Sequence, residues 1–591
     1  MRTARWISRI ACLALLLGTG AAAAADRPPA FDLTRYTRHS YVDEHAALVA
    51  ALTADSQAAQ AKARIELAAF YLAHAMLAEG RSVLAEVAPD TLAPADRARR
   101  GAIAAALQIL AGQGVKADAP DSPLVAANAG WADYDLWLSL NAALSGDTAA
   151  LRAHLSAGVA RLDSYPRPVE AACLPRLLKA AIDSRQWSLA KAIAIRFDRF
   201  PDLKAQPVYN YLLGMAAEKV NRPKKAIEAY GKAARGLDLY AQKARLALVD
   251  MGLKSGQMPP RAARVLLEDS LSLWRGDKYE LETLRRLAQV DRMLADWPAM
   301  LETLGRIVTL YPDSPDAGPA RAQAHSLIAA YYKLGLAGKI PLSTFVTTHR
   351  RITPLFRLDE VFEKQAELFA DRLFELGGTA MAAQEYGRID DTLGVAADLS
   401  LWHVSADRRA GLKLKRAEAL IRGGQFKPAA VVLAKVTAPD PGPRRDRLNA
   451  LRAQVYAGSG EPERVIDTTV SEPSPGYLRL LAQAYWSKGD WGNATRRYQQ
   501  LWHSYPDVFG GTDAINLLLA AYRAGDRATA RKVVAKFPDL ADSPQLQGER
   551  LLQTPASLEP LKRAAADARL QSAAEILDRL GKAKPGKAVS N

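Results

Sequence analysis

The sequence predicts an all-α protein, a superhelical solenoid in which helix–turn–helix units follow one another along the chain. Three observations support this fold class. Alanine, which has the highest intrinsic helix propensity, is abundant, and aromatic residues make up only 7% of the chain. One pattern of small and large apolar residues recurs, with a short polar turn inside each copy. Hydrophobic residues are 49% and charged residues 24%, as in folded globular proteins.

The clearest copy of the pattern lies in the first half of the chain. Leu213 and Ala217 are four residues apart, so they share one face of a helix. A polar turn follows, and Ala226 and Tyr230 then lie on a second helix. The small residues Gly214 and Ala226 allow two antiparallel helices to approach closely, and the Tyr230 ring fills the space beside them. We therefore expect a packed helix pair here.

The same spacing returns along the chain. The best C-terminal copy contains Leu481, Ala482, Tyr485, Gly489, Ala494, Tyr498, Leu501 and Pro506. Further copies contain Leu67, Leu287 and Phe369, and weaker ones centre on Ala417, Ala453 and Leu518. These motifs resemble the tetratricopeptide repeat family, whose unit is a helix–turn–helix of about 34 residues. The resemblance covers most of residues 60–540 and implies a tetratricopeptide-like solenoid.

The copies are unevenly spaced, and Pro/Gly-rich linkers separate several of them, so we expect a degenerate array. The expected segments are a signal peptide (1–25), an N-terminal lead-in (26–59), repeats (60–340), an irregular crossover (341–365), repeats (366–540), C-terminal capping helices (541–580) and a basic disordered tail (581–591). Capping helices are expected because the last helices of a solenoid must present a polar outer face to solvent.

The first 25 residues have the layout of a secretory signal peptide. Three arginines precede a short apolar stretch at 10–18, and Ala21–Ala25 supply the small residues of a cleavage site. The apolar stretch is shorter than the ~20 residues that a membrane-spanning helix needs. We therefore expect cleavage near Ala25 and a periplasmic or secreted mature protein without a transmembrane segment.

The sequence lacks the motifs of an enzyme or a metal protein. None of the eight histidines belongs to a His-Glu-x-x-His motif, and Cys173 is the only cysteine after residue 25. We expect Cys173 to be a buried apolar residue. Soluble lytic transglycosylases also begin with a helical superhelix, but the Glu-Ser pair of their catalytic domain does not occur in this sequence. We therefore expect no catalytic residue, no metal and no cofactor.

A partner-binding site is predicted on the concave face, which the first helices of a solenoid's units line. Aligning the C-terminal units places six side chains there, namely Gln454, Arg479, Gln483, Trp486, Asn516 and Arg523. The resemblance implies that such Asn, Gln and Arg residues grip an extended peptide or helix; simple solvation is the alternative for each. Conversely, Leu481, Ala482, Tyr485 and Tyr498 are expected to pack against neighbouring helices.

Two functions remain open at this stage. The net charge of +16 favours anionic partners, although the basic residues are scattered without a dense patch. The first hypothesis is an exported scaffold that binds a protein or peptide of the cell envelope, for a machine such as a polysaccharide exporter or the flagellar motor. The alternative is a glycan- or peptidoglycan-binding module that uses basic and aromatic residues. Nucleic acid is not expected as the partner of an exported protein.

Overall fold

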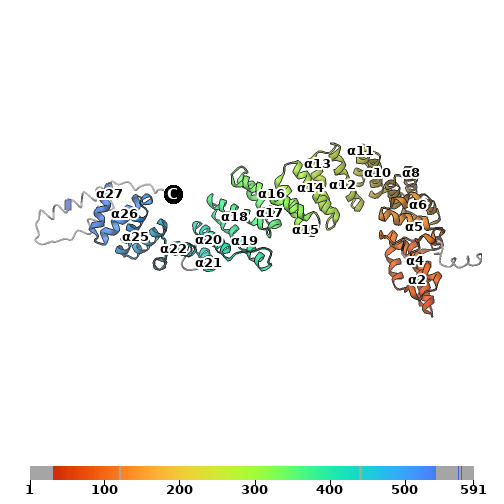
Figure 1. Ribbon diagram of the computed structural model, residues 1–591, viewed down its shortest axis with the longest axis horizontal. Helices are drawn as coiled ribbons and strands as arrows, with labels where there is room; N and C mark the ends of the chain where they lie inside the picture. The colour runs from red at the N-terminus through yellow and green to blue at the C-terminus, as the bar shows by residue number, and fades with distance from the viewer. Residues whose placement is uncertain are drawn as a thin grey trace, which may run out of the picture. The chain divides into compact units, whose positions relative to one another are not determined.

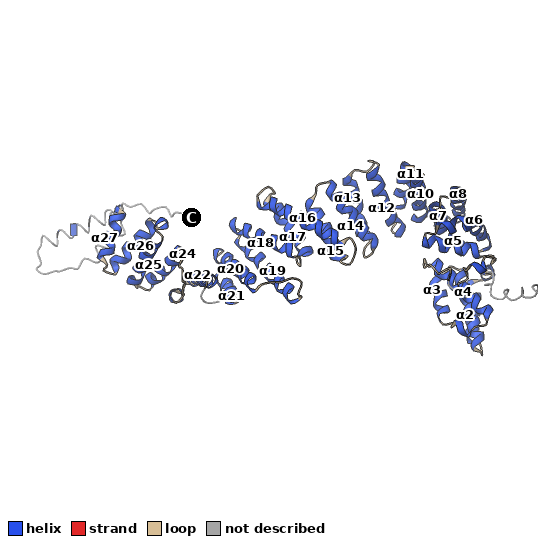
Figure 2. Ribbon diagram, viewed as in Figure 1, coloured by secondary structure: helices blue, strands red, loops and turns tan. Residues whose placement is uncertain are grey.

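The computed structural model describes residues 31–118, 122–437, 442–538 and 540, together with Asp567, Leu570, Gln571 and Ala574. Every regular element in this part of the chain is a helix, and no strand occurs there (Figure 2). The predicted all-α repeat fold is confirmed. The predicted signal peptide and basic tail lie outside the described residues, as do almost all of the predicted capping helices.

The chain forms two compact units, Met1–Thr303 and Leu304–Asn591. In each unit, most successive helices form pairs joined by short turns, a first helix and a second helix (Figure 1). Helix α15 (Trp297–Leu310) includes the residues at which one unit ends and the next begins.

The described part of the first unit begins with a 3-10 helix (Leu33–Thr37) and the short helix α1 (Tyr41–Ala50). Its first helices are α2 (Gln57–Ala73), α4 (Pro94–Leu110), α5 (Tyr134–Ser145), α7 (Arg167–Asp183), α10 (Pro207–Lys219), α12 (Leu239–Lys254) and α14 (Lys278–Met293). The second helices are α3 (Leu77–Ala85), α6 (Thr148–Arg161), α8 (Trp187–Arg196), α11 (Pro223–Ala233) and α13 (Pro260–Leu273), and α9 (Pro201–Ala205) is a single turn before α10.

The second unit continues the same alternation. Its first helices are α16 (Ala317–Leu336), α18 (Glu360–Glu375), α20 (Ala406–Arg422), α22 (Pro443–Gly458), α24 (Pro475–Ser487) and α26 (Gly511–Arg523). The second helices are α17 (Leu342–Phe356), α19 (Thr379–Asp398), α21 (Phe426–Ala434), α23 (Pro462–Ile466), α25 (Trp491–Ser504) and α27 (Arg527–Lys536).

Successive first helices start at uneven intervals. The interval runs from 32 residues (Pro207 to Leu239) to 46 residues (Glu360 to Ala406). The loose period read from the sequence is therefore confirmed, because long second helices such as α19 lengthen some units and the five-residue α23 shortens another.

The irregular crossover predicted over residues 341–365 is wrong. Helix α17 occupies most of it, and α18 begins before its end. Three large apolar side chains, Phe345, Ile352 and Phe356, lie on one face of α17 and are buried. Burial of this face stabilises the helix despite Pro354 in its last turn.

The turns between paired helices reuse one local structure. Gly489 adopts a φ of 74°, and the N–H of Asp490 donates to the carbonyl of Tyr485. The left-handed glycine and this hydrogen bond terminate α24. The Asp490 side chain then accepts a hydrogen bond from the N–H of Asn493 and caps α25. Gly525 and the turn between α26 and α27 repeat this arrangement. Each such turn reverses the chain within a few residues and keeps the paired helices adjacent.

The packing predicted for Gly214 and Tyr230 is confirmed. A Cβ atom at Gly214 would lie 2.5 Å from the Tyr230 ring, so only glycine lets α10 and α11 approach this closely. Tyr230 is 1% exposed, and its hydroxyl donates to Glu218 at 2.7 Å. In the C-terminal repeats, Leu481, Ala482 and Tyr498 are buried as predicted. Tyr485 departs from the prediction, because it is only partly buried.

Candidate functional site

The six predicted partner-binding residues lie on first helices, but they do not form one site. Gln454 is on α22, Arg479, Gln483 and Trp486 are on α24, and Asn516 and Arg523 are on α26. A cavity of about 420 Å³ lies between α24 and α26, and three of the six line it: Arg479, Gln483 and Asn516. We call it the α24–α26 cavity. Gln454 is partly buried elsewhere on α22 and does not line this cavity.

The Arg479 side chain is partly exposed but is held by three hydrogen bonds. Its guanidinium donates to both carboxylate oxygens of Asp513, at 2.9 and 2.8 Å, and to the carbonyl of Val508 at 2.8 Å. Asp513 is 6% exposed and also accepts the N–H of Gly510, which caps α26. Its carboxylate raises the pKa of Arg479 through these hydrogen bonds. Arg479 therefore joins α24 to α26 while it lines the cavity, and its role in partner binding stays a prediction.

Trp486 and Arg523 form a separate cluster with Trp491. The Trp486 and Trp491 rings meet edge to face with centroids 5.2 Å apart, and the Arg523 guanidinium lies 4.6 Å from the Trp491 centroid. These contacts join α24, α25 and α26. Neither Trp486 nor Arg523 lines the α24–α26 cavity, so the structure does not bring them into it with Arg479 and Gln483. The cluster packs adjacent helices, because each ring is turned toward another side chain.

The rest of the α24–α26 cavity is polar and open. Gln483 and Thr512 are exposed, and no hydrogen bond joins either side chain to another described residue. Tyr498 forms a buried wall, and burial raises its pKa to about 12. Gly510 and Gly511 leave open space where side chains would stand. The cavity therefore presents open backbone and amide and hydroxyl groups that remain able to bind.

Charged side chains of other first helices are paired in the same way as Arg479. Ion pairs between neighbouring first helices join Arg286 to Asp250, Lys415 to Asp371, Arg447 to Glu418 and Arg479 to Asp513. Each acid lies on the first helix before or after that of its partner. On this side of the repeats, much of the basic charge read from the sequence thus holds units together.

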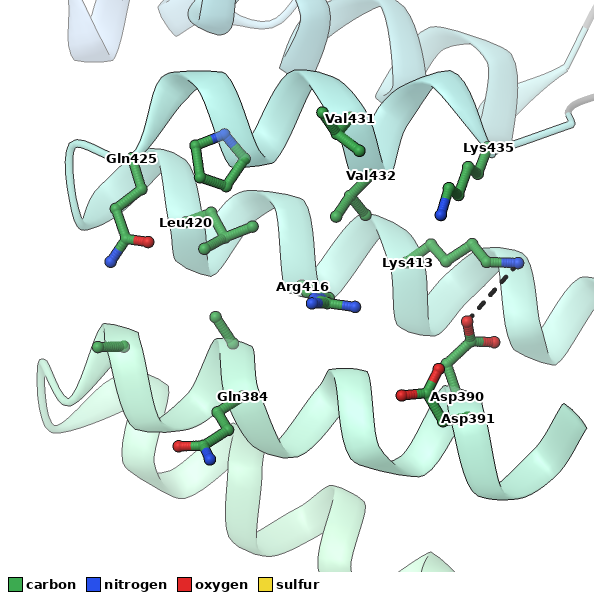
Figure 3. Close-up of a pocket in the computed structure, with 13 residues that line it drawn as sticks. Gln384, Asp390, Asp391, Lys413, Arg416, Leu420, Gln425, Val431, Val432 and Lys435 are labelled. Atoms are coloured by element: carbon green, nitrogen blue, oxygen red, sulfur yellow. Dashed lines mark ion pairs between the residues drawn. The ribbon is translucent and has the colours of Figure 1, made fainter. Parts of the chain in front are cut away.

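A second cavity, of about 500 Å³, was not predicted. It lies between the second helices α19 and α21, with the first helix α20 between them (Figure 3). We call it the α19–α21 cavity. Its apolar lining comes from all three helices and consists of Ala380, Ala383, Leu420, Pro428, Val431 and Val432.

Arg416 lies in the middle of the α19–α21 cavity (Figure 3). Its Nε atom is buried without a hydrogen-bond partner, and no ion pair joins it to another described residue. A Cβ atom at position 387 would lie 2.8 Å from the guanidinium carbon, so Gly387 provides the space in which the guanidinium rests on α19. Arg409 lies similarly over Gly394.

These residues carry a signal that the sequence reading missed. Gly387 and Gly394 are seven residues apart on one face of α19, and Arg409 and Arg416 are seven apart on α20. Two glycines and two arginines at matching intervals on consecutive antiparallel helices predict guanidinium groups seated on a helix backbone. Only the structure distinguishes the two arginines. Arg409 donates to Asp390 at 2.8 Å, whereas Arg416 has no acid partner among the described residues.

Neither metal nor membrane features stand out within the described residues. No group of three or more His, Cys, Asp or Glu side chains there could hold a metal ion. No helix of that part of the chain is long and apolar enough to cross a membrane. Cys173 is fully buried as predicted, and burial raises the pKa of its thiol to about 12, so the thiol is not a nucleophile at neutral pH.

Comparison with known proteins gives likeness to solved structures alone. No protein-family model matches the chain, and no curated protein matches it. The crystal structure of the P58(IPK) TPR domain is 15% identical, covers 60% of this chain and 99% of that chain, and has a TM-score of 0.19. The structure of Naa15/Naa10 bound to HypK-THB is 12% identical and has a TM-score of 0.23. The match covers 92% of this chain and 87% of that chain. The crystal structure of the APC/C hetero-tetramer Cut9–Hcn1 is 12% identical and has a TM-score of 0.24. The match covers 90% of this chain and 99% of that chain.

The fold assignment rests on the helix pairs described above. Paired antiparallel helices, turns with a left-handed residue and small residues at the helix crossings define a tetratricopeptide-like helical repeat protein. This class of protein binds other molecules on the surfaces of its stacked helices.

Proposed function

We propose that this protein is an exported scaffold that binds another protein, and that a segment of the partner lies in the α24–α26 cavity. One observation carries the proposal. Between two neighbouring first helices, Gln483 and Thr512 stand exposed beside the buried Tyr498 ring, with no internal hydrogen bonds from their side chains to the described residues. Beside a paired arginine, Arg479, these groups are available to a partner.

The chemistry of the cavity suits an extended peptide. The Gln483 amide can both donate to and accept from a peptide backbone, and the Thr512 hydroxyl can do the same. The open space at Gly510 and Gly511 admits a backbone close to the start of α26. The Tyr498 ring offers apolar contact to one side chain of the bound segment. Binding, not catalysis, is the role that this set of groups supports.

The proposed export rests on the layout of residues 1–25, with their arginines, short apolar stretch and small residues at Ala21–Ala25. The partner is then a component of the cell envelope, in a machine such as a polysaccharide exporter or the flagellar motor. Mass spectrometry of the protein recovered from an osmotic-shock fraction tests this step. Cleavage beside Ala25 is expected, and recovery of a chain that still carries Met1 in the cytoplasmic fraction contradicts export.

Site-directed photo-crosslinking tests the proposed groove. A photoreactive phenylalanine analogue replaces Gln483 in one variant and Gln257, an exposed residue in the turn after α12, in the control. Irradiation of living cells is expected to give a discrete protein adduct from position 483 and none from position 257. Adducts of equal yield at both positions, or none at 483, would rule out the groove.

A second arm separates the protein partner from the glycan alternative. Purified sacculi are sedimented with the mature protein and with the Gln483→Ala/Thr512→Ala double variant. A protein-binding groove predicts no sedimentation of either. Sedimentation of the mature protein that is lost in the double variant assigns the groove to glycan and overturns the protein partner.

A further inference from the structure

We propose that the α19–α21 cavity is a separate binding site for a monocarboxylate carried on a small apolar body. It is independent of the proposed partner groove, because it lies between second helices and shares no residue with the α24–α26 cavity. The inference is built from the Arg416 guanidinium, the charge around it, the apolar wall and the size of the cavity.

The Arg416 guanidinium is the anchor. Its Nε–H is buried without an acceptor, and its side chain has no acid partner among the described residues. Buried donors are nearly always satisfied, so an unsatisfied one inside a cavity points to an acceptor that comes from outside the chain. A planar guanidinium matches the two oxygens of a carboxylate in a bidentate pair.

The guanidinium is held in place before any ligand arrives. Gly387 on α19 leaves room for it, since a Cβ atom there would stand 2.8 Å from its central carbon and 2.9 Å from Nη1. The group therefore rests on the α19 backbone while its stem comes from α20. Fixing the group in this way lowers the entropy that binding would otherwise cost.

The lining of the cavity has an excess of one positive charge, which a ligand with one negative charge would balance. The cavity lining contains the cations Lys413, Arg416 and Lys435 and the anions Asp390 and Asp391, an excess of one positive charge. Asp390 is already paired, with Arg409 at 2.8 Å and Lys413 at 3.7 Å. Figure 3 shows both aspartates at the Lys413 end of the cavity, away from Gln384 and Gln425. Arg416 between these ends remains without a partner.

The apolar wall defines the rest of the ligand. Leu420, Val431 and Val432 face the cavity from α20 and α21, opposite the α19 wall (Figure 3). A volume of about 500 Å³ falls in the range of small-molecule pockets and accommodates a body of the size of one or two amino acids. A sugar acid also carries a carboxylate, but its hydroxyl groups would lose hydrogen bonds with water against this wall.

Matched ligands test the proposal on the full-length mature chain. N-acetyl-leucine carries a carboxylate on an apolar body, N-acetyl-leucinamide has the same body without the charge, and glucuronate has the same charge on a polar body. Calorimetric titration is expected to show binding of N-acetyl-leucine. The amide and glucuronate are each expected to bind about tenfold more weakly or less.

Two variants and one control locate the site. Arg416→Gln removes the anchor, and Val431→Glu adds a negative charge at an exposed position of the wall without disturbing a buried residue. Arg531→Gln makes the same charge change as the first variant on an exposed arginine of α27. Both cavity variants should weaken N-acetyl-leucine binding about tenfold or more, and the control should bind as the natural protein does.

The outcomes that overturn the inference are equally clear. Equal affinity for the acid and the amide, or unchanged binding by both cavity variants, removes Arg416 as the anchor. Glucuronate binding as tight as that of N-acetyl-leucine overturns the apolar body. Lack of binding by all three ligands to the natural protein overturns the site. Because none of these ligands tests the α24–α26 groove, failure here leaves the proposed scaffold role to its own experiments.

Discussion

The two cavities of the second unit place an arginine of a first helix in opposite situations. Arg479 in the α24–α26 cavity is bound by Asp513 and by the carbonyl of Val508, whereas Arg416 in the α19–α21 cavity has no acid partner among the described residues. The volumes are similar, about 420 and 500 Å³. An arginine that lines a cavity is therefore a candidate ligand only when its own chain has not supplied an acceptor.

The difference follows from the two sides of the repeats. Neighbouring first helices lie close enough for charged side chains to reach across, and four such ion pairs join them in the two units. Between the second helices α19 and α21 the gap is a cavity, and Arg416 reaches into it. The four ion pairs therefore hold units together, whereas Arg416 has no acid partner among the described residues and can serve binding.

The largest expected effect tests the wall of the α24–α26 cavity. Tyr498 is 3% exposed within a core that includes Leu478 and Leu517. Tyr498→Ala should lower the free energy of unfolding by about 3 kcal/mol, because it leaves a void the size of an aromatic ring. Urea denaturation followed by circular dichroism measures it. Tyr485→Ala, at a partly buried position, is the control and should cost clearly less.

The second expected effect concerns the acid that holds Arg479. Asp513→Ala should lower the free energy of unfolding by about 2 kcal/mol. The variant loses the hydrogen bonds that Arg479 donates to the carboxylate, and it loses the capping hydrogen bond from the N–H of Gly510. Asp507→Ala, at an exposed position before α26, should stay within about 0.5 kcal/mol. Equal free energies of unfolding for the two variants would show that the cap and the ion pair contribute little.

The third expected effect isolates the ion pair from the cap. Arg479→Met leaves the cap of α26 intact but removes the partner of a carboxylate whose side chain is 9% exposed. Because the Arg479 side chain is itself 40% exposed, solvent screens the pair, and we expect a loss of about 1 kcal/mol. A double-mutant cycle with Asp513→Ala should return a coupling energy of similar size. A coupling of zero contradicts a cohesive role for Arg479.

The smallest expected effect is at Arg416. Arg416→Met should change the free energy of unfolding by less than about 0.5 kcal/mol, because the buried Nε has no hydrogen bond to lose. The same urea series measures it beside Arg479→Met. If the two arginine variants lose equal stability, Arg416 has a structural role and the contrast between the cavities disappears.

The sequence by itself determined the repeat fold. Gly214 with Tyr230, the spacing of Leu481, Ala482 and Tyr498, and the glycines at helix ends act within one unit, where contacts lie within about 30 residues. Such contacts follow from helix periodicity, so a pattern of small and large residues suffices to find them. The same reading failed at residues 341–365, where the repeat spacing is interrupted but burial of Phe345 and Ile352 still stabilises a helix.

Only the tertiary structure decided which charges are free. Arg479 meets an acid 34 residues away, on the next first helix, and its fate depends on the rotation and spacing of whole units. Arg416 has no such acid, although its position in the repeat gives no sign of the difference. Periodicity specifies which face of a helix a residue occupies, but pairing between units depends on distances that a degenerate period does not encode. The candidate sites therefore emerged from the packing of units, and the fold from the pattern within them.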